Sequence, residues 1–519
     1  MSMDGLPKEF DLVVIGGGIT GAGILREAVR AGLWTLLVEK QDFAQGTSSR
    51  SSKMVHGGLR YLKEGKIFLT KAAVEERCRL LNEAPGLVEK MGFLWPIYKG
   101  ESPGKHSLEI GLTLYDFMAR EKQHEYFHSG KFLLLTPHVR QENLLGGFKF
   151  FDAQVDDARL VQRLINESRD LGGKALNYVA AKEILRDEQN CVAGVVIEDA
   201  ETGESRTIGT RAVINATGWW AESLHPSPVE GLHLRPLRGS HILFPSHVLP
   251  AAQAVAFAHP VDRRPIFVLP WEGATMVGTT DLDHKGDPWA EPAMSRRELD
   301  YLMDGIHGVY PSLSVEESDI ISSFAGVRPV VSRGKKDPSQ ESREHVVWVD
   351  KGLVTITGGK LTTFRLLALD ALDAAEPFME RIPHHKPNEP VFAPVPKTPP
   401  PDAKGLSAQA WRRLFGRYGL KAPGLVEDAP RGALEQVGDT ETLFAELPFA
   451  AKNETIRHLS DLMLRRTRLG LLTPKGGEEF LDQIIDLCKP YLGWDDERWE
   501  EEREAYLKLI REAYSIPAS

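Results

Sequence analysis

Short apolar runs alternate with helical repeats over the first 385 positions. Residues 12–15 form an apolar run that predicts a buried strand, and residues 34–38 form a second run after a helical stretch. Residues 157–171 carry apolar positions three and four apart and are followed by two glycines, which predicts a helix with a glycine cap. Residues 353–357 predict a last strand before another helix. This alternation indicates an α/β fold.

Several other segments fit the same organisation. Residues 67–90 predict a long helix. Residues 175–180, 191–199 and 204–209 predict a β-meander, and residues 240–280 are rich in short β patterns. The first part of the chain is therefore expected to contain two kinds of β structure.

A proline-rich segment separates this part from a helical one. Residues 386–403 contain seven prolines, so this linker should be extended and stiff. The segments after it with apolar residues at helical spacing are residues 407–418, 441–446, 453–469, 477–487 and 495–514. The sequence predicts a large first part, residues 1–385, and a C-terminal helical domain, residues 404–519.

The first strand runs directly into a glycine-rich turn and a helix. Gly16 permits the tight turn, Gly18 lets the backbone approach a pyrophosphate, and Gly21 lets the helix lie close to the strand. The second strand ends at Glu39, 18 residues after Gly21, where a carboxylate can accept hydrogen bonds from a ribose. These features predict a dinucleotide site with the phosphates at the helix N-terminus. The acid at position 39 argues against a 2′-phosphate.

Glycines at the ends of two later strands enlarge the expected site. They belong to Ala216-Thr217-Gly218 and to Gly358-Gly359-Lys360. One large cofactor lying across one sheet accounts for contacts that are spread so far along the chain. This spread favours FAD over NAD.

The composition excludes some classes of protein. A net charge of −10 over 519 residues argues against nucleic-acid binding and means that an anionic substrate needs local cations. No apolar run approaches the length of a membrane-spanning helix, and the first nine residues lack the apolar core of a signal peptide. Cys78, Cys191 and Cys488 lie far apart, which indicates a reducing compartment. We expect a cytoplasmic protein.

Segments spread over nearly the whole chain resemble the FAD-dependent, aerobic-type, quinone-linked glycerol-3-phosphate dehydrogenases. The most specific is TSSRSSKMVHGGLRYL at residues 47–62. The others, in order, are residues 155–160, 215–218, 238–241, 270–271, 278–281, 325–329, 358–364 and 464–470. The combination is far more specific than any one motif.

The resemblance implies the fold of the D-amino-acid-oxidase-like flavoproteins. That fold has a Rossmann-like FAD-binding domain and a β-rich substrate domain, to which this chain adds a C-terminal helical domain. The FAD-binding segments are then expected at about residues 8–75, 150–235 and 325–380. The substrate and cap segments are expected at about residues 76–149 and 236–324.

The resemblance also implies an activity, the oxidation of sn-glycerol 3-phosphate to dihydroxyacetone phosphate. A hydride passes from C2 to FAD, and the electrons then pass to a membrane quinone. A glycerol-3-phosphate oxidase that reduces O₂ to H₂O₂ is the alternative; an amino-acid oxidase of the same fold and a flavin-binding sensor are further alternatives. Quinone reduction implies peripheral attachment to the inner face of the cytoplasmic membrane, through residues 411–418 or 93–119. We also expect that the chain can form a homodimer.

The substrate requires a phosphate clamp and a base. Cations that follow glycine-bearing motifs suit the phosphate, and Lys360 has a second expected role beside the flavin. His241 is the first candidate for the base and His56 the alternative, because an imidazole titrates near neutrality. The residues expected to bind the phosphate are Arg60, Tyr61, Arg328 and Lys360.

The expected FAD contacts combine the glycine turns with the serine-rich loop after Glu39, whose hydroxyl and N–H groups can bind phosphate. We expect no metal site, because the adjacent His384 and His385 lie beside the linker and should not converge as ligands. The residues expected to bind FAD are Gly16, Gly18, Gly21, Glu39, Ser48, Ser49, Ser52, Lys53, His56, Gly57, Ala216, Thr217, Gly218, Gly359, Lys360, Leu361 and Thr362.

Overall fold

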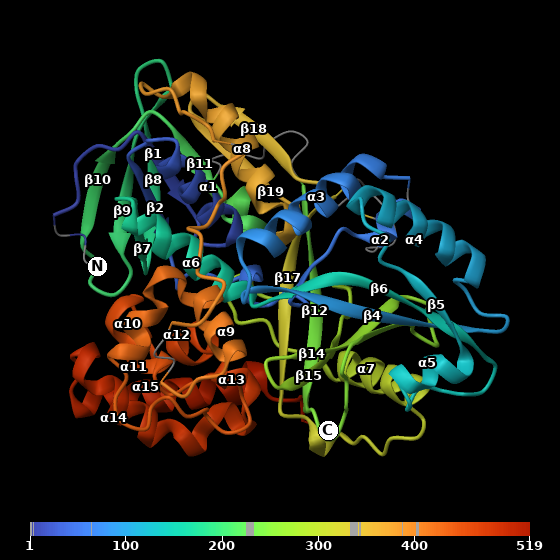
Figure 1. The fold of residues 1–519 in the computed structure, drawn as a ribbon. Helices are drawn as coiled ribbons and strands as arrows, with labels where there is room; N and C mark the ends of the chain where they lie inside the picture. Colours follow the sequence, from blue (N-terminus) through green and yellow to red (C-terminus); the bar gives the residue numbers. More distant parts are fainter. Residues whose placement is uncertain are drawn as a thin grey trace.

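The computed structural model describes residues 3, 5–63, 65–224, 233–332, 341, 344–386, 388–400 and 404–518. Figure 1 shows a first sheet with its helices, a second and larger sheet, and a helical C-terminal domain, coloured orange to red, that lies against both. The expected combination of an α/β part, a β-rich part and a helical domain is confirmed.

The first sheet is mostly parallel. Within the described residues its strand order is β18 (Val346–Asp350), β19 (Leu353–Thr357), β11 (Val213–Asn215), β1 (Leu12–Ile15), β2 (Thr35–Glu39) and β7 (Lys174–Asn177). Only the pairing of β18 with β19 is antiparallel among these strands. Because neighbouring parallel strands end at the same edge, the turns after β1, β2, β11 and β19 meet there.

Both faces of this sheet are covered, which explains why its strands are apolar throughout. Leu12 and Val14 belong to the core that includes α1 (Ile19–Arg30), α6 (Asp157–Asp170) and α8 (Phe364–Ala375). Val13 and Ile15, which point to the opposite face, pack with the antiparallel strands of the expected meander. These strands are β8 (Val179–Arg186), β9 (Val192–Asp199) and β10 (Ser205–Gly209).

The second sheet forms the expected β-rich part. The long pair β12–β17 runs antiparallel from Leu234 opposite Val331 to Leu243 opposite Ser322. The helix α7 (Arg296–Val309) packs into its core. The strands described in this sheet are β3 (Met54–Val55), β4 (Val88–Tyr98), β5 (Glu125–His128), β6 (Leu144–Val155), β12 (Leu234–Pro245), β13 (Ala254–Ala258), β14 (Pro265–Trp271), β15 (Ala274–Gly278), β16 (Leu282–Asp283) and β17 (Ser322–Val331).

Besides α7, the described helices near this sheet include α2 (Leu59–Lys63), α3 (Ile67–Glu83), α4 (Lys105–Ala119) and α5 (Ser129–Leu135). The predicted helix at residues 67–90 is therefore too long. Pro85 and Gly86 follow the end of α3, Gly86 has a φ of 85°, and the chain then enters β4.

The C-terminal domain is helical, with two predicted helices altered. The predicted helix at residues 453–469 is broken into α12 (Leu459–Asp461), a π-helical turn (Leu462–Arg466) and α13 (Leu469–Leu472). Residues 441–445 are not helical, because α11 begins only at Glu446, whose carboxylate accepts a hydrogen bond from the Leu443 N–H. The remaining α-helices described here are α9 (Ala408–Tyr418), α10 (Ala422–Glu427), α11 (Glu446–Asn453), α14 (Leu481–Leu492) and α15 (Asp496–Leu509).

Buried ion pairs join this domain to the first sheet. Arg465 and Arg466 both bind the carboxylate of Asp42, just after β2. Arg468 binds Asp156 and Asp157 at the start of α6. All these charged side chains are at most 2% exposed. The broken helix serves these contacts, because it turns three arginines toward carboxylates of the first part.

The proline-rich segment is docked rather than free. Val391 and Phe392 are buried in the core that includes α8. The Val391 carbonyl also accepts a hydrogen bond from the buried Arg26. Residue 387 and residues 401–403 of the predicted linker lie outside the described part.

Candidate active site

A cavity of about 1110 Å³ is lined by residues of both sheets. Ile15, Val38 and Ala216 come from the ends of first-sheet strands, whereas Phe267 and Arg328 come from the second sheet. The volume exceeds the range of about 300–1,000 Å³ that is usual for one small ligand. The cavity can therefore hold a dinucleotide and a small substrate together.

The glycine turn after β1 forms one wall. Gly16 has a φ of 110°, and a Cβ there would lie 2.7 Å from the Ala216 carbonyl oxygen. A Cβ on Gly21 would lie 1.8 Å from the Gly16 carbonyl oxygen, so only glycine allows this approach of helix and turn. Gly18 lines the cavity, and the Ile19 N–H beside it donates to the Ser48 hydroxyl at 2.8 Å. The start of α1 thus faces the cavity, where the positive end of the helix dipole favours a phosphate.

Glu39 stands at the end of β2 on the same wall. One carboxylate oxygen accepts a hydrogen bond from the Gly17 N–H at 2.6 Å, and the other from the Gln41 N–H at 2.9 Å. Burial raises the pKa of Glu39 above its ordinary value. Each oxygen keeps a second lone pair, so the side chain is oriented by its neighbours and can still accept from a ribose.

The serine-rich loop only partly matches its expected role. Ser48 and Ser52 line the cavity, whereas Ser49 and Lys53 do not. The Lys53 ammonium is fully buried, 2.9 Å from Asp157, and donates to the Ser49 carbonyl. The expectation that Lys53 itself contacts the cofactor is corrected, because its charge is held by Asp157 beneath the loop.

Two later turns complete the cofactor wall. Residues 216–218 and 358–362, in the two turns where the sequence analysis expects cofactor contacts, all line the cavity. The His56 N–H donates to the Thr362 hydroxyl at 3.1 Å, and this hydroxyl donates to the His56 carbonyl at 3.2 Å. These bonds join the loop before α2 to the turn just before α8. Gly57 lies behind this wall, with its N–H donating to the Tyr115 hydroxyl.

The predicted phosphate ligands meet at this cavity as far as their side chains are described. Tyr61, Arg328 and Lys360 line it, and the Lys360 ammonium lies 3.8 Å from the centre of the Tyr61 ring. Arg60 belongs to α2, but its side chain lies outside the described part. Sequence reasoning missed Arg264, which also lines the cavity; an arginine before an ordinary β pattern gave no signal.

The two candidate bases are placed differently. His56 lines the cavity, whereas His241 is 1% exposed and stacks on Phe324 with ring centres 4.7 Å apart. His241 reaches the cavity wall only through Ser52, whose hydroxyl is 2.8 Å from Nε2. Burial, together with Arg328 and Lys53, lowers the pKa of His241 well below its ordinary value.

One predicted membrane-contact segment is buried. Residues 411–418 form most of α9, in which Trp411, Leu414 and Phe415 are at most 4% exposed. Arg413 and Arg417 pair with Glu446 and Asp156 inside the molecule. The expectation that this stretch faces a membrane is corrected, because its apolar side chains and two of its three arginines, Arg413 and Arg417, are internal. Arg412 is half exposed and pairs with Glu89. Within the described residues, every helix is too short or too polar to cross a bilayer.

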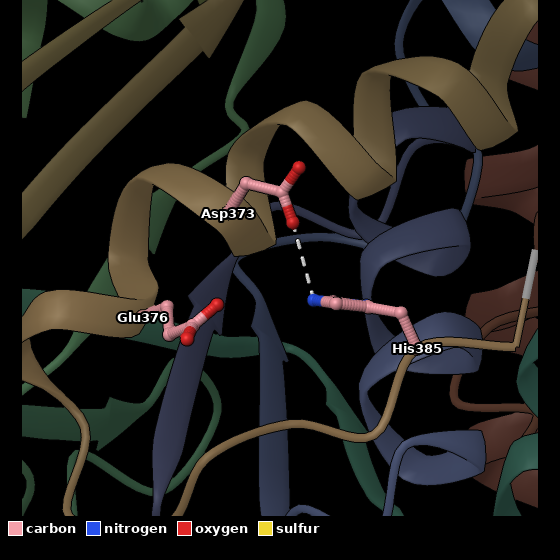
Figure 2. Close-up of side chains that lie close together, drawn as sticks. All are labelled: Asp373, Glu376 and His385. Atoms are coloured by element: carbon pink, nitrogen blue, oxygen red, sulfur yellow. Dashed lines mark ion pairs between the residues drawn. The ribbon is translucent and has the colours of Figure 1, made fainter.

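A cluster of possible metal ligands lies outside the cavity (Figure 2). The ligand atoms of Asp373, Glu376 and His385 lie within 4.8 Å of one another. The His385 side chain approaches the end of α8 from the following loop, with Nε2 3.2 Å from Asp373. The sequence places only His384 and His385 beside each other and does not reveal that His385 meets carboxylates of another segment. Because Asp373 is 65% exposed, an ordinary surface ion pair accounts for the arrangement.

Comparisons with known proteins agree with this geometry. The profile of the family described as FAD dependent oxidoreductase matches residues 11–365, and that of the C-terminal domain of alpha-glycerophosphate oxidase matches residues 372–499. The aerobic glycerol-3-phosphate dehydrogenase of Staphylococcus haemolyticus (strain JCSC1435) is 33% identical, over 98% of this chain and 95% of its own. The corresponding protein of Bacillus subtilis (strain 168) is also 33% identical, over 99% and 97%.

Solved structures show the same similarity. The glycerol-3-phosphate dehydrogenase from Bacillus halodurans complexed with FAD has a TM-score of 0.75 and 28% identity, covering 97% of this chain and 95% of that one. The L-alpha-glycerophosphate oxidase from Mycoplasma pneumoniae, with FAD bound, has a TM-score of 0.60 and 18% identity, covering 75% and 100%. The second comparison supports the fold alone.

Proposed function

Because this chain belongs to the family of the FAD-dependent aerobic glycerol-3-phosphate dehydrogenases, we propose that it oxidises sn-glycerol 3-phosphate to dihydroxyacetone phosphate and passes the electrons to a membrane quinone. One observation supports this most strongly. Tyr61, Arg328 and Lys360 line the same cavity as the dinucleotide turn and Glu39. A flavin and an anionic substrate can therefore share one enclosed space.

FAD is the cofactor, and when bound it accepts the hydride that leaves C2 of the substrate. The N-terminus of α1 would hold its pyrophosphate, and Glu39 its adenosine ribose. The absence of a Cβ at Gly18 leaves room for this group: the nearest atom to such a Cβ is the Ser48 hydroxyl, at 3.0 Å. These residues leave space for the cofactor beside the start of α1.

Arg328 and Lys360 are proposed to hold the phosphate and so to fix C2 relative to the flavin. Orientation of this kind can supply much of the rate. Arginine offers paired donors to phosphate oxygens, and lysine adds a compact charge. The protein as a whole is negatively charged, at −10, so these cations provide the local attraction that a dianion needs.

We propose His56 as the group that takes the hydroxyl proton, in place of His241. His56 is half-buried and lines the cavity, and its backbone is fixed by Thr362. His241 lies behind Ser52, and burial together with Arg328 lowers its pKa, which makes it a weaker proton acceptor. It suits a supporting role, in which it orients the Ser52 hydroxyl.

The quinone is proposed to reach the flavin past α4. Ile110 and Leu114 line the cavity and are also exposed, so an apolar path runs from the surface inward. Phe117 on the same helix is 80% exposed, and Phe68 on the adjacent α3 is 88% exposed. Such a patch fits a lipid surface, which also supplies a lipid-soluble acceptor. This surface supports our proposal of peripheral attachment to a membrane, which the sequence analysis expects at the inner face of the cytoplasmic membrane; homodimer formation stays a prediction.

Anaerobic reduction of the flavin tests the substrate. We expect that sn-glycerol 3-phosphate bleaches the yellow protein, whereas glycerol and amino acids do not. Flavin reduction by an amino acid but not by sn-glycerol 3-phosphate would identify an amino-acid oxidase. No flavin reduction by any of these compounds would favour a flavin-binding sensor. Reoxidation by a quinone analogue should be much faster than by O₂; the reverse order would identify an oxidase.

Vesicle sedimentation tests the membrane surface. The double variant Phe68→Ser/Phe117→Ser should lose binding to vesicles of phosphatidylethanolamine and phosphatidylglycerol but keep anaerobic reduction by substrate. Trp34→Ser is the matched control, because Trp34 is 65% exposed and lies outside the cavity wall. Equal sedimentation of wild type and the double variant would exclude this surface.

A further inference from the structure

Two arginines on the cavity wall share one carboxylate. Arg328 Nη1 lies 3.0 Å from one oxygen of Asp281, and Arg264 Nη2 lies 2.9 Å from the other. Arg264 also donates to the Asp281 backbone carbonyl at 3.2 Å. All three residues line the cavity. Asp281 thus holds two guanidinium groups side by side, from the start of β14 and from β17.

The carboxylate between them is fixed. The Asp281 side chain is 2% exposed, whereas those of Arg264 and Arg328 are 29% and 25% exposed toward the cavity. The preceding Thr280 donates to the buried Glu298 at 2.7 Å and accepts from the Ser240 N–H at 2.9 Å. The turn that carries Asp281 is therefore anchored to α7 and β12.

The second sheet leaves space for this arrangement. A Cβ on Gly239 would lie 2.2 Å from Arg328 Nη2, so the guanidinium occupies the room that a side chain on β12 would take. The same Nη2 donates to the Thr279 hydroxyl at 2.9 Å. Arg328 is held by contacts from two strands and a turn, which fixes the direction of its guanidinium group.

The charges balance for a particular kind of ligand. Two guanidinium groups and one carboxylate leave one positive charge, and Lys360 on the same cavity adds a second. A phosphomonoester carries close to two negative charges at neutral pH, because its second pKa is about 6. A guanidinium group can also bind two phosphate oxygens through parallel N–H donors.

We propose that Arg264 is a second phosphate-binding residue and that Asp281 is a positioning residue that presents Arg264 and Arg328 together to a phosphomonoester dianion. This rests on the proposed function, in which the substrate is such an ester. It extends the clamp beyond the cations that the sequence indicated. It also explains why the buried Asp281 pairs with two arginines at the cavity wall.

The test separates substrate binding from chemistry. In Arg264→Gln, KM for sn-glycerol 3-phosphate should rise at least tenfold, while the limiting rate of anaerobic flavin reduction changes less than about threefold. The inhibition constant of inorganic phosphate should rise by a similar factor. Arg264→Lys should lie between wild type and Arg264→Gln, since it keeps one charge but loses the paired donors. Asp281→Asn should raise KM while the protein retains FAD.

A matched control removes a similar pair outside the cavity. Arg235 binds Asp283 through two nitrogens, close by in the same sheet, and neither residue lines the cavity. Arg235→Gln should keep KM and phosphate inhibition at wild-type values. Unchanged KM and phosphate inhibition in both Arg264 variants would overturn the proposal and make the Arg264–Asp281 pair structural.

Failure of the proposed function gives a different result. If sn-glycerol 3-phosphate never reduces wild-type flavin, titration of the holoenzyme with inorganic phosphate, followed by flavin absorbance, still examines the anion site. Binding that weakens at least tenfold in Arg264→Gln, and by a smaller factor in Arg264→Lys, would support the clamp for another phosphomonoester. Equal binding in wild type and both variants would refute it.

Discussion

Arg466 donates two hydrogen bonds to the carboxylate of Asp42, at 2.6 and 2.8 Å, although 424 residues separate them. Neither side chain is exposed. Asp42 follows β2, whose end carries Glu39, so the C-terminal domain holds the chain beside the expected ribose ligand. The pair therefore connects stability of the domain interface with order in the cofactor site.

Loss of this pair should be costly. Arg466→Met leaves the Asp42 charge buried, with one arginine where there were two, and breaking a buried pair typically costs about 3–5 kcal/mol. We expect a decrease of that order in the free energy of unfolding, measured by urea denaturation of the holoenzyme. Arg412→Met is the control, because Arg412 and its partner Glu89 are about half exposed and such pairs contribute about 0–1 kcal/mol. Equal effects of the two variants would contradict this account.

Gly18→Val should abolish FAD retention with little loss of fold. Gly18 has an extended backbone, which valine also adopts. A Cβ there would contact only the Ser48 side chain, with the hydroxyl oxygen nearest at 3.0 Å. The added methyl groups would instead fill the space beside the N-terminus of α1. Flavin absorbance after purification measures the loss. Gly130→Val, at a site where nothing lies within 4 Å of a Cβ, should keep full absorbance.

Arg328→Ala should impair substrate use far more than cofactor binding. Truncating a hydrogen-bonded partner of a buried charge commonly costs about 2–5 kcal/mol, and Asp281 would also lose one of its two arginines. We expect kcat/KM for sn-glycerol 3-phosphate to fall at least thirtyfold at unchanged flavin content. A change below about threefold would remove Arg328 from the clamp.

The two histidines should separate kinetically. His56→Gln should lower the rate of anaerobic flavin reduction by about 10²–10⁴-fold, the usual contribution of a general base. The acidic limb of its pH–rate profile should disappear as well. His241→Gln should lose much less rate and keep that limb. If the effects were exchanged, the proton would leave through Ser52 to His241.

His241 should instead contribute to the pH dependence of stability. Its pKa in the folded protein lies below the ordinary value of about 6.5, so below that pH the unfolded chain binds a proton that the folded protein excludes. The contribution of His241 to the free energy of unfolding is fully present above about pH 6.5. It declines as the pH falls, by at most about 1.4 kcal/mol per pH unit. Urea denaturation at pH 7.5 and 5.5 should show that His241→Gln loses less stability than wild type. His247→Gln, at an exposed position, should follow wild type.

Local signals in the sequence predicted the cofactor wall well. Gly16, Gly18 and Glu39 form it through neighbours in the chain or through strand ends that a parallel sheet brings together. The wall therefore depends on backbone geometry, which glycine spacing encodes directly.

Side chains whose partners lie far away in the chain were harder to predict. The arginines of α9 resemble a basic helix surface, yet Arg417 pairs with Asp156, which is 261 residues away. Lys53 likewise forms an ion pair with the distant Asp157. Arg264 is held at the cavity by an ion pair with Asp281. Periodicity and composition carry no information about such pairings, because they depend on how whole elements are stacked.

The docked proline-rich segment changes how this protein can be divided. The sequence suggests residues 386–403 as a place to divide the chain into two separate domains. Separation there would remove from Asp42, Asp156 and Asp157 the arginines of the C-terminal domain that bind them. The two halves are therefore not interchangeable modules. A hybrid that takes its C-terminal domain from a relative should fold only where the relative supplies matching arginines, so the halves are expected to be inherited and exchanged as one unit.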